Sequence, residues 1–328
     1  MSHPTKTSAS TLSEFQIIER YFAPLASQVA LGLKDDAACF TPPPGHDLIV
    51  SKDVLVADRH FFADDAAADI AFKALSVNVS DLAAKGATPQ HYLLGLVLPK
   101  EFAGHHWLKG FAYGLESAQK TYGIHLVGGD TVATEGPLCI SITAIGYAVE
   151  GAMIKRSEAK AGDDIYVSGT LGDAAFGLQA IKTGQGQTEE FSKRYHRPTA
   201  RPELGKALQG IASAAADVSD GLLADARHIC QASGIGARLF QAKLPLSEAG
   251  VKALEKDTTL WPLVFSGGDD YEIVFMADPS NAAAVKKISQ TLGLQITKIG
   301  VAIPGSAVEL VDCTDKLVQV AGEGFEHF

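Results

Sequence analysis

The sequence predicts an α/β protein built from two domains. Short apolar runs typical of strands alternate with helical patterns along the chain, which is the pattern of an α/β fold. With 328 residues, the chain is long enough for one large domain or two of ordinary size. We place the boundary near residue 150, because the segment 153–162 is polar and basic compared with its flanks. The prediction is a disordered tail over 1–12, an N-terminal domain over 13–150 and a C-terminal domain over 151–328.

The N-terminal domain is expected to begin with a helix that Ser13 can cap, with Glu14 in its first turn. The clearest helix is alanine-rich, carries apolar residues at helical spacing and stops at Gly86. Near-continuous apolar runs are typical of strands, and the first of them is expected to be short and buried. The expected helices span 14–22, 65–85 and 106–122, and the expected strands span 47–51, 92–98, 124–127 and 138–149.

The C-terminal domain continues the alternation of strands and helices from the apolar run Asp164–Ser168 onward. The segment 184–187 is expected to be a flexible loop, because glycine leaves the backbone unrestrained. The expected helices span 173–182, 204–212 and 221–233, and the expected strands span 164–168, 215–218, 271–276, 295–301 and 308–311.

The composition is that of an ordinary globular protein, with 46% hydrophobic and 20% charged residues. A net charge of -10 argues against a nucleic-acid groove or an anionic membrane surface as partner, because both need a basic face. The four cysteines lie far apart without zinc-like or redox-like spacing, which favours free thiols in a reducing compartment. The start of the chain lacks an apolar signal core, and no apolar run reaches membrane-spanning length, so we expect a soluble cytoplasmic protein.

Six short motifs carry carboxylates beside glycine, serine or threonine. They are Lys34-Asp35-Asp36, Ser51-Lys52-Asp53, Asn78-Val79-Ser80-Asp81, Gly128-Gly129-Asp130-Thr131, Asp217-Val218-Ser219-Asp220-Gly221 and Ser266-Gly267-Gly268-Asp269-Asp270. Such oxygen ligands suit Mg²⁺, which keeps part of its coordination shell for substrate phosphates. Each acid alone fits a helix cap or an Asx turn equally well, so the pattern leaves both interpretations open. The hypothesis is a phosphoryl-transfer site with several Mg²⁺ ions.

For three residues, a functional role competes with a simpler structural explanation. Asp81 follows a partly buried apolar stripe, where it is either a metal ligand or the helix partner of Lys85. His60 is either a functional side chain or a surface or capping histidine. Arg156 is either a brace for phosphate oxygens or a solvated linker charge. The sequence has no P-loop, no protein-kinase motif set and no Gly-x-Ser-x-Gly nucleophile elbow.

Taken together and in order, the motifs resemble the thiamine-monophosphate kinase family, in the superfamily of aminoimidazole ribonucleotide synthetase and selenophosphate synthetase. The stretches that carry the resemblance are 32–38, 51–56, 59–61, 73–84, 128–131, 167–174, 217–222 and 266–272. The resemblance implies an N-terminal α/β domain whose sheet forms a barrel across a homodimer, and a C-terminal α/β domain. It also implies transfer of the γ-phosphoryl group of ATP to thiamine monophosphate, assisted by several Mg²⁺ ions and without a covalent nucleophile.

The resemblance also implies roles for individual residues. The Mg²⁺ ligands would be Asp36, Ser51, Asp53, Asp81, Asp130, Asp217 and Asp220. The ATP contacts would be Tyr113, Gly129, Asp130, Arg156 and Ser219, and the thiamine-phosphate contacts His60, Asp269 and Phe325. We expect these dispersed acids to converge around a shared cluster of metal ions.

The chain departs from the family pattern at several of these positions. Lys52 stands where the family usually has Thr, Lys34 replaces a usual glycine, and Asp269 replaces the more common Glu. The C-terminal region offers Phe325 where the family often places a Trp. Two other functions stay open: activation of another small acceptor by ATP within the same superfamily, and a non-catalytic module that binds nucleotide or thiamine phosphate. Selenophosphate synthesis is disfavoured because no cysteine precedes Cys39.

Overall fold

The computed structural model describes residues 12–186 and 188–320, so all but the last residue of the predicted disordered tail lies outside it. The contacts divide the chain into two compact units, and each unit is made of several chain segments. The first unit consists of the chain up to Phe40 together with Lys52–Ala74 and His91–Thr143. The second consists of Thr41–Ser51, Leu75–Gln90 and the chain from Ala144 onward.

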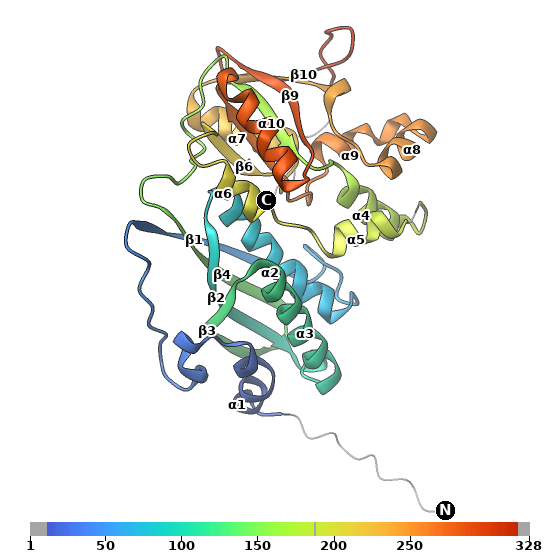
Figure 1. Ribbon diagram of the computed structural model, residues 1–328. Helices are drawn as coiled ribbons and strands as arrows, with labels where there is room; N and C mark the ends of the chain where they lie inside the picture. The colour runs from blue at the N-terminus through green and yellow to red at the C-terminus, as the bar shows by residue number, and fades with distance from the viewer. Residues whose placement is uncertain (1–11, 187, 321–328) are drawn as a thin grey trace, which may run out of the picture. The chain divides into compact units, whose positions relative to one another are not determined.

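Four strands form an open sheet in the order β1-β4-β2-β3 (Figure 1). These strands are β1 (His46–Val56), β2 (Thr88–Pro99), β3 (His125–Thr134) and β4 (Cys139–Val149). Strands β2 and β3 pair in parallel, with a register shift between Tyr92 and Leu93. The sheet is accompanied by the helices α2 (Ala67–Ala84) and α3 (His105–Tyr122). The start of α2 packs closely against the middle of α3, since a Cβ on Gly114 would lie 2.1 Å from the carbonyl oxygen of Ala68.

The N-terminal segment of the first unit is a chain of short helical turns. Ser13 and Gln16 form a capping box at the start of α1 (Glu14–Ile17), as the predicted cap requires. A π-helix over Ile18–Phe22 and 3₁₀ turns over Ala23–Leu25 and Gln28–Leu33 follow. The segment 14–22 is therefore helical as predicted, but only its first turn is α-helix.

The second unit contains a six-stranded mixed sheet in the order β10-β7-β9-β5-β8-β6. Its strands are β5 (Asp164–Ser168), β6 (Ala214–Asp217), β7 (Gly236–Phe240), β8 (Ile273–Ala277), β9 (Ile296–Ile303) and β10 (Val308–Val311). The α-helices after Ala144 are α4 (Asp173–Thr183), α5 (Glu189–His196), α6 (Pro202–Ala207), α7 (Leu222–Ser233), α8 (Glu248–Lys256), α9 (Trp261–Ser266) and α10 (Ala282–Leu292). Shorter 3₁₀ turns occur at Lys100–Phe102 in the first unit and at Gln241–Lys243, Thr258–Leu260 and Pro279–Asn281 in the second. Strand β5 is buried at every position, and its apolar residues Ile165 and Val167 lie in the main hydrophobic core.

Four predictions about elements are wrong in detail. The strand predicted over 124–127 is longer, because β3 continues to Thr134 and contains Gly129 and Asp130. The first strand does not end near Ser51, because β1 continues to Val56, and most of its residues are exposed or half-buried rather than buried. The predicted helix 204–212 is shorter, because α6 ends at Ala207. The sequence interpretation also missed β7, α5, α8, α9 and α10, all of which are short.

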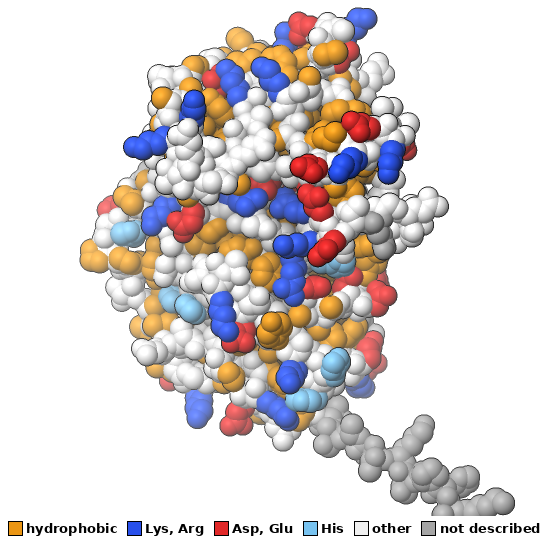
Figure 2. Space-filling view, turned by 45° about the vertical axis from the view of Figure 1, so that its right-hand side comes forward, with side chains coloured by type: hydrophobic (Ala, Val, Ile, Leu, Met, Phe, Trp, Pro, Cys, Tyr) orange, Lys and Arg blue, Asp and Glu red, His pale blue; other side chains and the backbone are white. Residues whose placement is uncertain are grey.

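The surface shows mixed charges, and the length and polarity of the helices bear on whether they could cross a membrane. On the face shown in Figure 2, basic and acidic side chains are interspersed among neutral ones. In residues 12–186 and 188–320, none of the helices combines the length and the apolar character that crossing a membrane would need.

Candidate functional site

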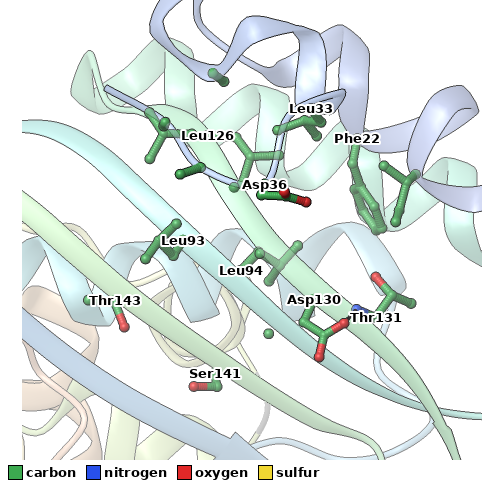
Figure 3. Close-up of a pocket in the computed structure, with 18 of the residues that line it drawn as sticks. Phe22, Leu33, Asp36, Leu93, Leu94, Leu126, Asp130, Thr131, Ser141 and Thr143 are labelled. Carbon is green, nitrogen blue, oxygen red and sulfur yellow. Dashed lines mark hydrogen bonds between the residues drawn. The ribbon is translucent and has the colours of Figure 1, made fainter. Parts of the chain in front are cut away.

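A pocket of about 470 Å³ lies within the first unit and combines an apolar lining with a polar one (Figure 3). Among the apolar lining residues are Ile18, Phe22, Leu33, Leu93, Leu94 and Leu126. The polar side chains in the lining are Asp35, Asp36, Lys52, Asp130, Thr131, Ser141 and Thr143. Pockets that hold small molecules are typically apolar with a few placed polar groups. This pocket has that character, and it contains two of the predicted metal ligands and Gly129.

Strand β3 presents Asp130 to the pocket. The backbone N–H of Thr131 donates to the Asp130 Oδ1 atom over 2.8 Å, which holds the exposed carboxylate in place. Directly before it, a Cβ on Gly129 would lie 1.9 Å from the carbonyl oxygen of Leu94. Only glycine therefore allows β3 to approach β2 so closely at this point. The Gly-Gly-Asp motif thus serves the sheet as well as the pocket.

Asp36 reaches the pocket from the loop that follows the last N-terminal 3₁₀ turn (Figure 3). The turn ends irregularly, with positive φ angles of 51° at Leu31 and 56° at Leu33. Beyond it, the Asp36 backbone N–H donates to the Asp35 Oδ1 atom over 2.8 Å. Asp36 and Asp130 therefore share one pocket although they are far apart in the sequence.

A second group of predicted residues lies in the second unit. The Ser51 hydroxyl donates to the Asp81 carboxylate, and the Ser80 hydroxyl donates to Asp217 Oδ2 over 2.8 Å. Burial and the neighbouring charge of Asp81 raise the pKa of Asp217 to about 7. The charge of Asp81 is thus close enough to disfavour ionisation of the buried Asp217 carboxylate.

Lys85 lies beside these acids but does not form the predicted helix pair with Asp81. Its ammonium donates to the carbonyl oxygen of Ala215 over 2.7 Å. Burial, together with the charge of Arg156, lowers the pKa of Lys85 to about 8, while Asp217 and Asp81 act in the opposite direction. Arg156 is therefore close enough to influence this group electrostatically, although its side chain is exposed.

The two C-terminal motifs are joined by backbone hydrogen bonds within the second unit. The N–H of Asp269 donates to the carbonyl oxygen of Ser219 over 2.9 Å. A Cβ on Gly268 would lie 2.5 Å from that same oxygen, so glycine is required there. Asp269 itself has a positive φ of 62°, and the Tyr271 hydroxyl donates to its Oδ1 atom over 2.9 Å. Ser219 and Asp269, predicted for nucleotide and substrate, are thus held together.

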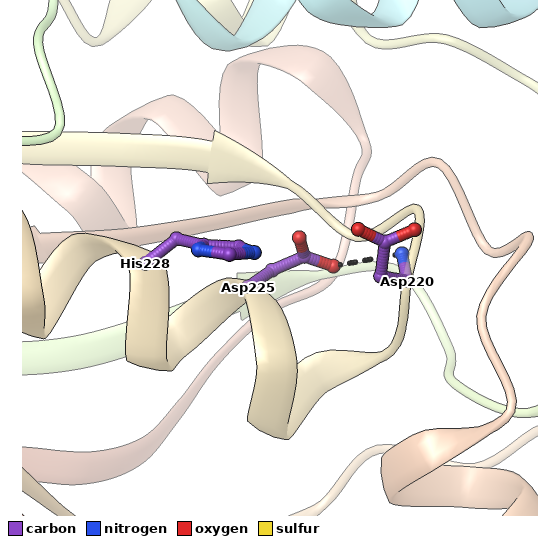
Figure 4. A group of neighbouring side chains, drawn as sticks. All are labelled: Asp220, Asp225 and His228. Carbon is purple, nitrogen blue, oxygen red and sulfur yellow. Dashed lines mark hydrogen bonds between the residues drawn. The ribbon is translucent and has the colours of Figure 1, made fainter. Parts of the chain in front are cut away.

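Asp225 supports the loop that carries Ser219 and Asp220, and the sequence interpretation missed it. Its buried carboxylate accepts from the backbone N–H groups of Ser219 over 3.0 Å and of Asp220 over 3.1 Å (Figure 4). Burial, with the charges of Asp217 and Asp220, raises its pKa well above the usual value. Polar ligand atoms of Asp220, Asp225 and His228 lie within 4.8 Å of one another. The spacing of Asp225 and His228 at i, i+3 on α7 was the available signal.

A buried acid in the last motif gives a prediction about pH. Burial raises the pKa of Asp270 to about 8, against the opposing effects of Arg194 and the Gly172 N–H. A raised folded-state pKa contributes stability that is complete below the unfolded value near 4 and is lost as pH rises through about 8. We expect Asp270→Asn to flatten the fall in stability between about pH 5 and pH 8, measured by urea unfolding. The exposed Asp278, whose pKa is lowered, is the control, and Asp278→Asn should leave that slope unchanged.

The remaining predicted residues lie outside the pocket lining. His60 is half-buried, and its Nδ1 atom lies 3.0 Å from the Val56 backbone nitrogen and 3.4 Å from the Val56 carbonyl oxygen. Tyr113 lies on α3 with 61% of its surface exposed. Asp53 lies on β1 and is half-buried. Phe325 falls outside the described residues.

The donor atoms present fit Mg²⁺ in each unit taken by itself. In the first unit, the three exposed carboxylates of Asp35, Asp36 and Asp130 line one pocket, and all are hard oxygen donors. In the second, Asp81 raises the pKa of Asp217, which is a repulsion that a bound cation would relieve. The expectation that all seven predicted ligands share one metal cluster stays a prediction.

Comparison with protein-family models identifies the class of protein to which the chain belongs. The family model for the N-terminal domain of AIR synthase related proteins matches residues 34–148, and the model for their C-terminal domain matches residues 160–313. The fold is therefore the two-domain α/β fold of AIR synthase related proteins, as the motif order suggested.

Relatives and solved structures narrow this class. The thiamine-monophosphate kinase of Salmonella typhimurium is 43% identical over 296 residues, which cover 88% of this chain and 89% of the relative. That of Caulobacter vibrioides is 41% identical over 305 residues, covering 90% and 86%. The crystal structure of thiamine-monophosphate kinase from Stenotrophomonas maltophilia is 38% identical with a TM-score of 0.78, covering 85% of this chain and 89% of that one. A structure described as AaThiL complexed with AMPPCP and TMP is 31% identical with a TM-score of 0.77, covering 99% and 100%.

This chain belongs to the thiamine-monophosphate kinase family. The resemblance inferred from the motifs is thereby confirmed. Hydrogenase maturation proteins named HypE share the fold at 19–22% identity, with TM-scores up to 0.78. At that identity the likeness concerns the fold alone.

Proposed function

We propose that this protein is an ATP-dependent kinase that transfers the γ-phosphoryl group of ATP to thiamine monophosphate, giving thiamine diphosphate. The observation that carries the proposal is the match over 99% of this chain to a protein solved with AMPPCP and TMP, together with 43% identity to a named thiamine-monophosphate kinase. The pocket of the first unit supports it, because its apolar lining suits a base and its carboxylates suit metal-bound phosphates.

The reaction proposed is direct in-line transfer without a phosphoenzyme. The acceptor atom is an oxygen of a phosphate group, which is already ionised and needs no strong general base. When bound, Mg²⁺ supplies charge neutralisation between the two polyanions. The residues of the chain orient the two substrates for in-line attack, and such positioning accounts for much of the barrier lowering in this type of reaction.

The assignment of residues is part of the proposal. Carboxylates and one hydroxyl would hold Mg²⁺, namely Asp36, Ser51, Asp53, Asp81, Asp130, Asp217 and Asp220. The nucleotide would contact Tyr113, Gly129, Asp130, Arg156 and Ser219, and thiamine phosphate would contact His60, Asp269 and Phe325. The rigid tie between Ser219 and Asp269 supports a common role for their two loops.

The proposal is tested by measuring ADP release with and without thiamine monophosphate, and by identifying the product by mass spectrometry. We expect ADP to form only when thiamine monophosphate is present, with thiamine diphosphate in equal amount. ADP formation that ignores the thiamine compound would instead favour another acceptor, and binding without turnover would favour a non-catalytic module. With γ-labelled ATP, label on the protein itself would contradict direct transfer.

A homodimer with a barrel across it is also a proposal. The single chain has an open four-stranded sheet, and its strands carry exposed apolar side chains that a partner sheet would cover. Within the first unit these are Val54 on β1, Leu93 on β2 and Val132 on β3, which are 45%, 39% and 44% exposed. The domain limits 13–150 and 151–328 and the cytoplasmic location are proposed on the sequence arguments given above.

A further inference from the structure

Lys52 is the sole basic side chain among the described residues that line the pocket of the first unit. It extends from β1, and its Nζ atom lies 2.5 Å from the Ser141 Oγ atom and 3.5 Å from the Thr143 Oγ1 atom. Both partners are neutral hydroxyls on β4, so they orient the ammonium without cancelling its charge. A positive group is therefore held in a pocket whose other charged side chains are carboxylates.

Lys52 begins a row of residues that crosses the sheet. Its partner Ser141 lies beside Gly95 on β2, since a Cβ on Gly95 would be 3.3 Å from the Ser141 Cβ atom. Gly95 is in turn the register partner of Asp130 on β3. Neighbouring strands are about 4.8 Å apart, so the backbones of Lys52 and Asp130 are separated by roughly 14 Å. Because Gly95 has no side chain, the middle of this row is open.

The row places a cation at one end and a carboxylate at the other. A nucleotide phosphate chain near Asp36 and Asp130 is repelled by them unless positive charge intervenes. Bound Mg²⁺ can supply that charge beside the carboxylates, but the β1 end of the row already has a positive group of its own. An ammonium acts there as a point charge that needs no metal to bind phosphate.

We propose that Lys52 binds the phosphate groups of the nucleotide directly and supplies metal-independent affinity at the β1 end of the pocket. This inference rests on the proposed function, because it takes the pocket to be the nucleotide site. In this proposal the Lys52 ammonium contacts the phosphate groups itself, without a metal ion between them.

Binding of AMPPCP to the full-length protein, measured by isothermal titration calorimetry in EDTA and in excess Mg²⁺, tests the inference. We expect Lys52→Met to weaken binding about tenfold in EDTA, which corresponds to one charge-assisted contact. The loss should also shrink as salt is raised, because it is electrostatic. Lys52→Arg keeps the charge and should retain most of the affinity.

Two further variants separate the charge from other causes. Lys34→Met removes an exposed lysine that does not line the pocket, and it should bind as the wild type does. Lys52→Gln keeps a donor for Ser141 while losing the charge, so it should behave like Lys52→Met and covers the case that Met disturbs the fold. Unchanged affinity in both Lys52→Met and Lys52→Gln, or an equal loss in Lys34→Met, would overturn the inference.

The outcome is distinguishable from a failure of the proposed function. If the wild type converts thiamine monophosphate and the Lys52 variants bind AMPPCP normally, only the role of Lys52 is wrong. If the wild type binds AMPPCP in Mg²⁺ but shows no measurable affinity in EDTA, the metal-independent contribution is refuted. If the wild type binds no nucleotide under either condition, the proposed function and the inference fall together.

Discussion

Replacing Asp130 by Asn is expected to lower turnover of thiamine monophosphate by about a hundredfold to a thousandfold. The change weakens a proposed Mg²⁺ ligand while keeping the side chain's size. The loss would fall on the charge neutralisation that the metal would supply during transfer, and single contributions of this kind are of that order. The Asp130 side chain is exposed, and its Oδ1 atom accepts from the Thr131 N–H, a bond that the amide oxygen of Asn can also accept. Steady-state kinetics at saturating ATP measure the effect.

The control for Asp130 is another exposed carboxylate just beyond the same strand. Glu135 forms an exposed ion pair with Lys100 at 2.9 Å and does not line the pocket. Glu135→Gln should therefore leave turnover within about twofold, since exposed pairs contribute little. Thermal unfolding of both variants should match that of the wild type. Turnover of Asp130→Asn close to that of the wild type would remove Asp130 from the proposed metal ligands.

Replacing Arg201 by Met is expected to lower the free energy of unfolding by about 3 kcal/mol, because it breaks a buried ion pair from one side. Glu272 is 1% exposed at its side chain and accepts from Arg201 Nε over 2.8 Å and from Arg201 Nη2 over 2.5 Å. Arg194 donates to the same carboxylate over 3.1 Å, and the Ser168 hydroxyl over 2.6 Å. These two partners remain in the variant and limit the loss. Urea unfolding measures it.

A matched arginine tests whether burial causes this effect. Arg238 pairs with Glu309 at 2.9 Å, but their side chains are 41% and 26% exposed. Arg238→Met should cost no more than about 1 kcal/mol, as is usual for exposed pairs. Equal losses in the two variants would mean that desolvation of Glu272 is not what makes Arg201 important. Glu272 directly follows the loop of Asp269 to Tyr271. A large loss of stability in Arg201→Met would therefore indicate that the Arg201–Glu272 pair helps to hold that loop.

Local patterns predicted several elements well and the site only in part. The alanine-rich helix predicted over 65–85 is α2 over 67–84, and β5 and β10 have the predicted limits. Here the spacing of the apolar residues and the glycine after the element were sufficient to predict its limits. By contrast, α8 was missed although Ser247 caps it by accepting from Gly250 N–H. The cap was readable, but the helix has only nine residues.

Several features were not predicted because they depend on contacts between distant segments or on backbone groups. Nothing local in the sequence says that Ser80 reaches Asp217, 137 residues away, or that Lys85 turns to Ala215 instead of Asp81. The length of β1 was underestimated because the polar run Ser51-Lys52-Asp53 interrupts its apolar residues and resembles a loop, whereas the strand continues through it to Val56. Asp225 was missed because its role is to accept two backbone N–H groups, a function that no side-chain motif records.

The segmented make-up of the two units has a consequence for dissecting the protein. Each unit is made of separated stretches, and the chain passes from one unit to the other at Phe40 to Thr41, Ser51 to Lys52, Ala74 to Leu75, Gln90 to His91 and Thr143 to Ala144. No single proteolytic cut or truncation therefore separates the two units, because stretches of the two alternate along the polypeptide. We expect limited digestion to yield no autonomous half, and we expect separately expressed halves to regain structure only when mixed.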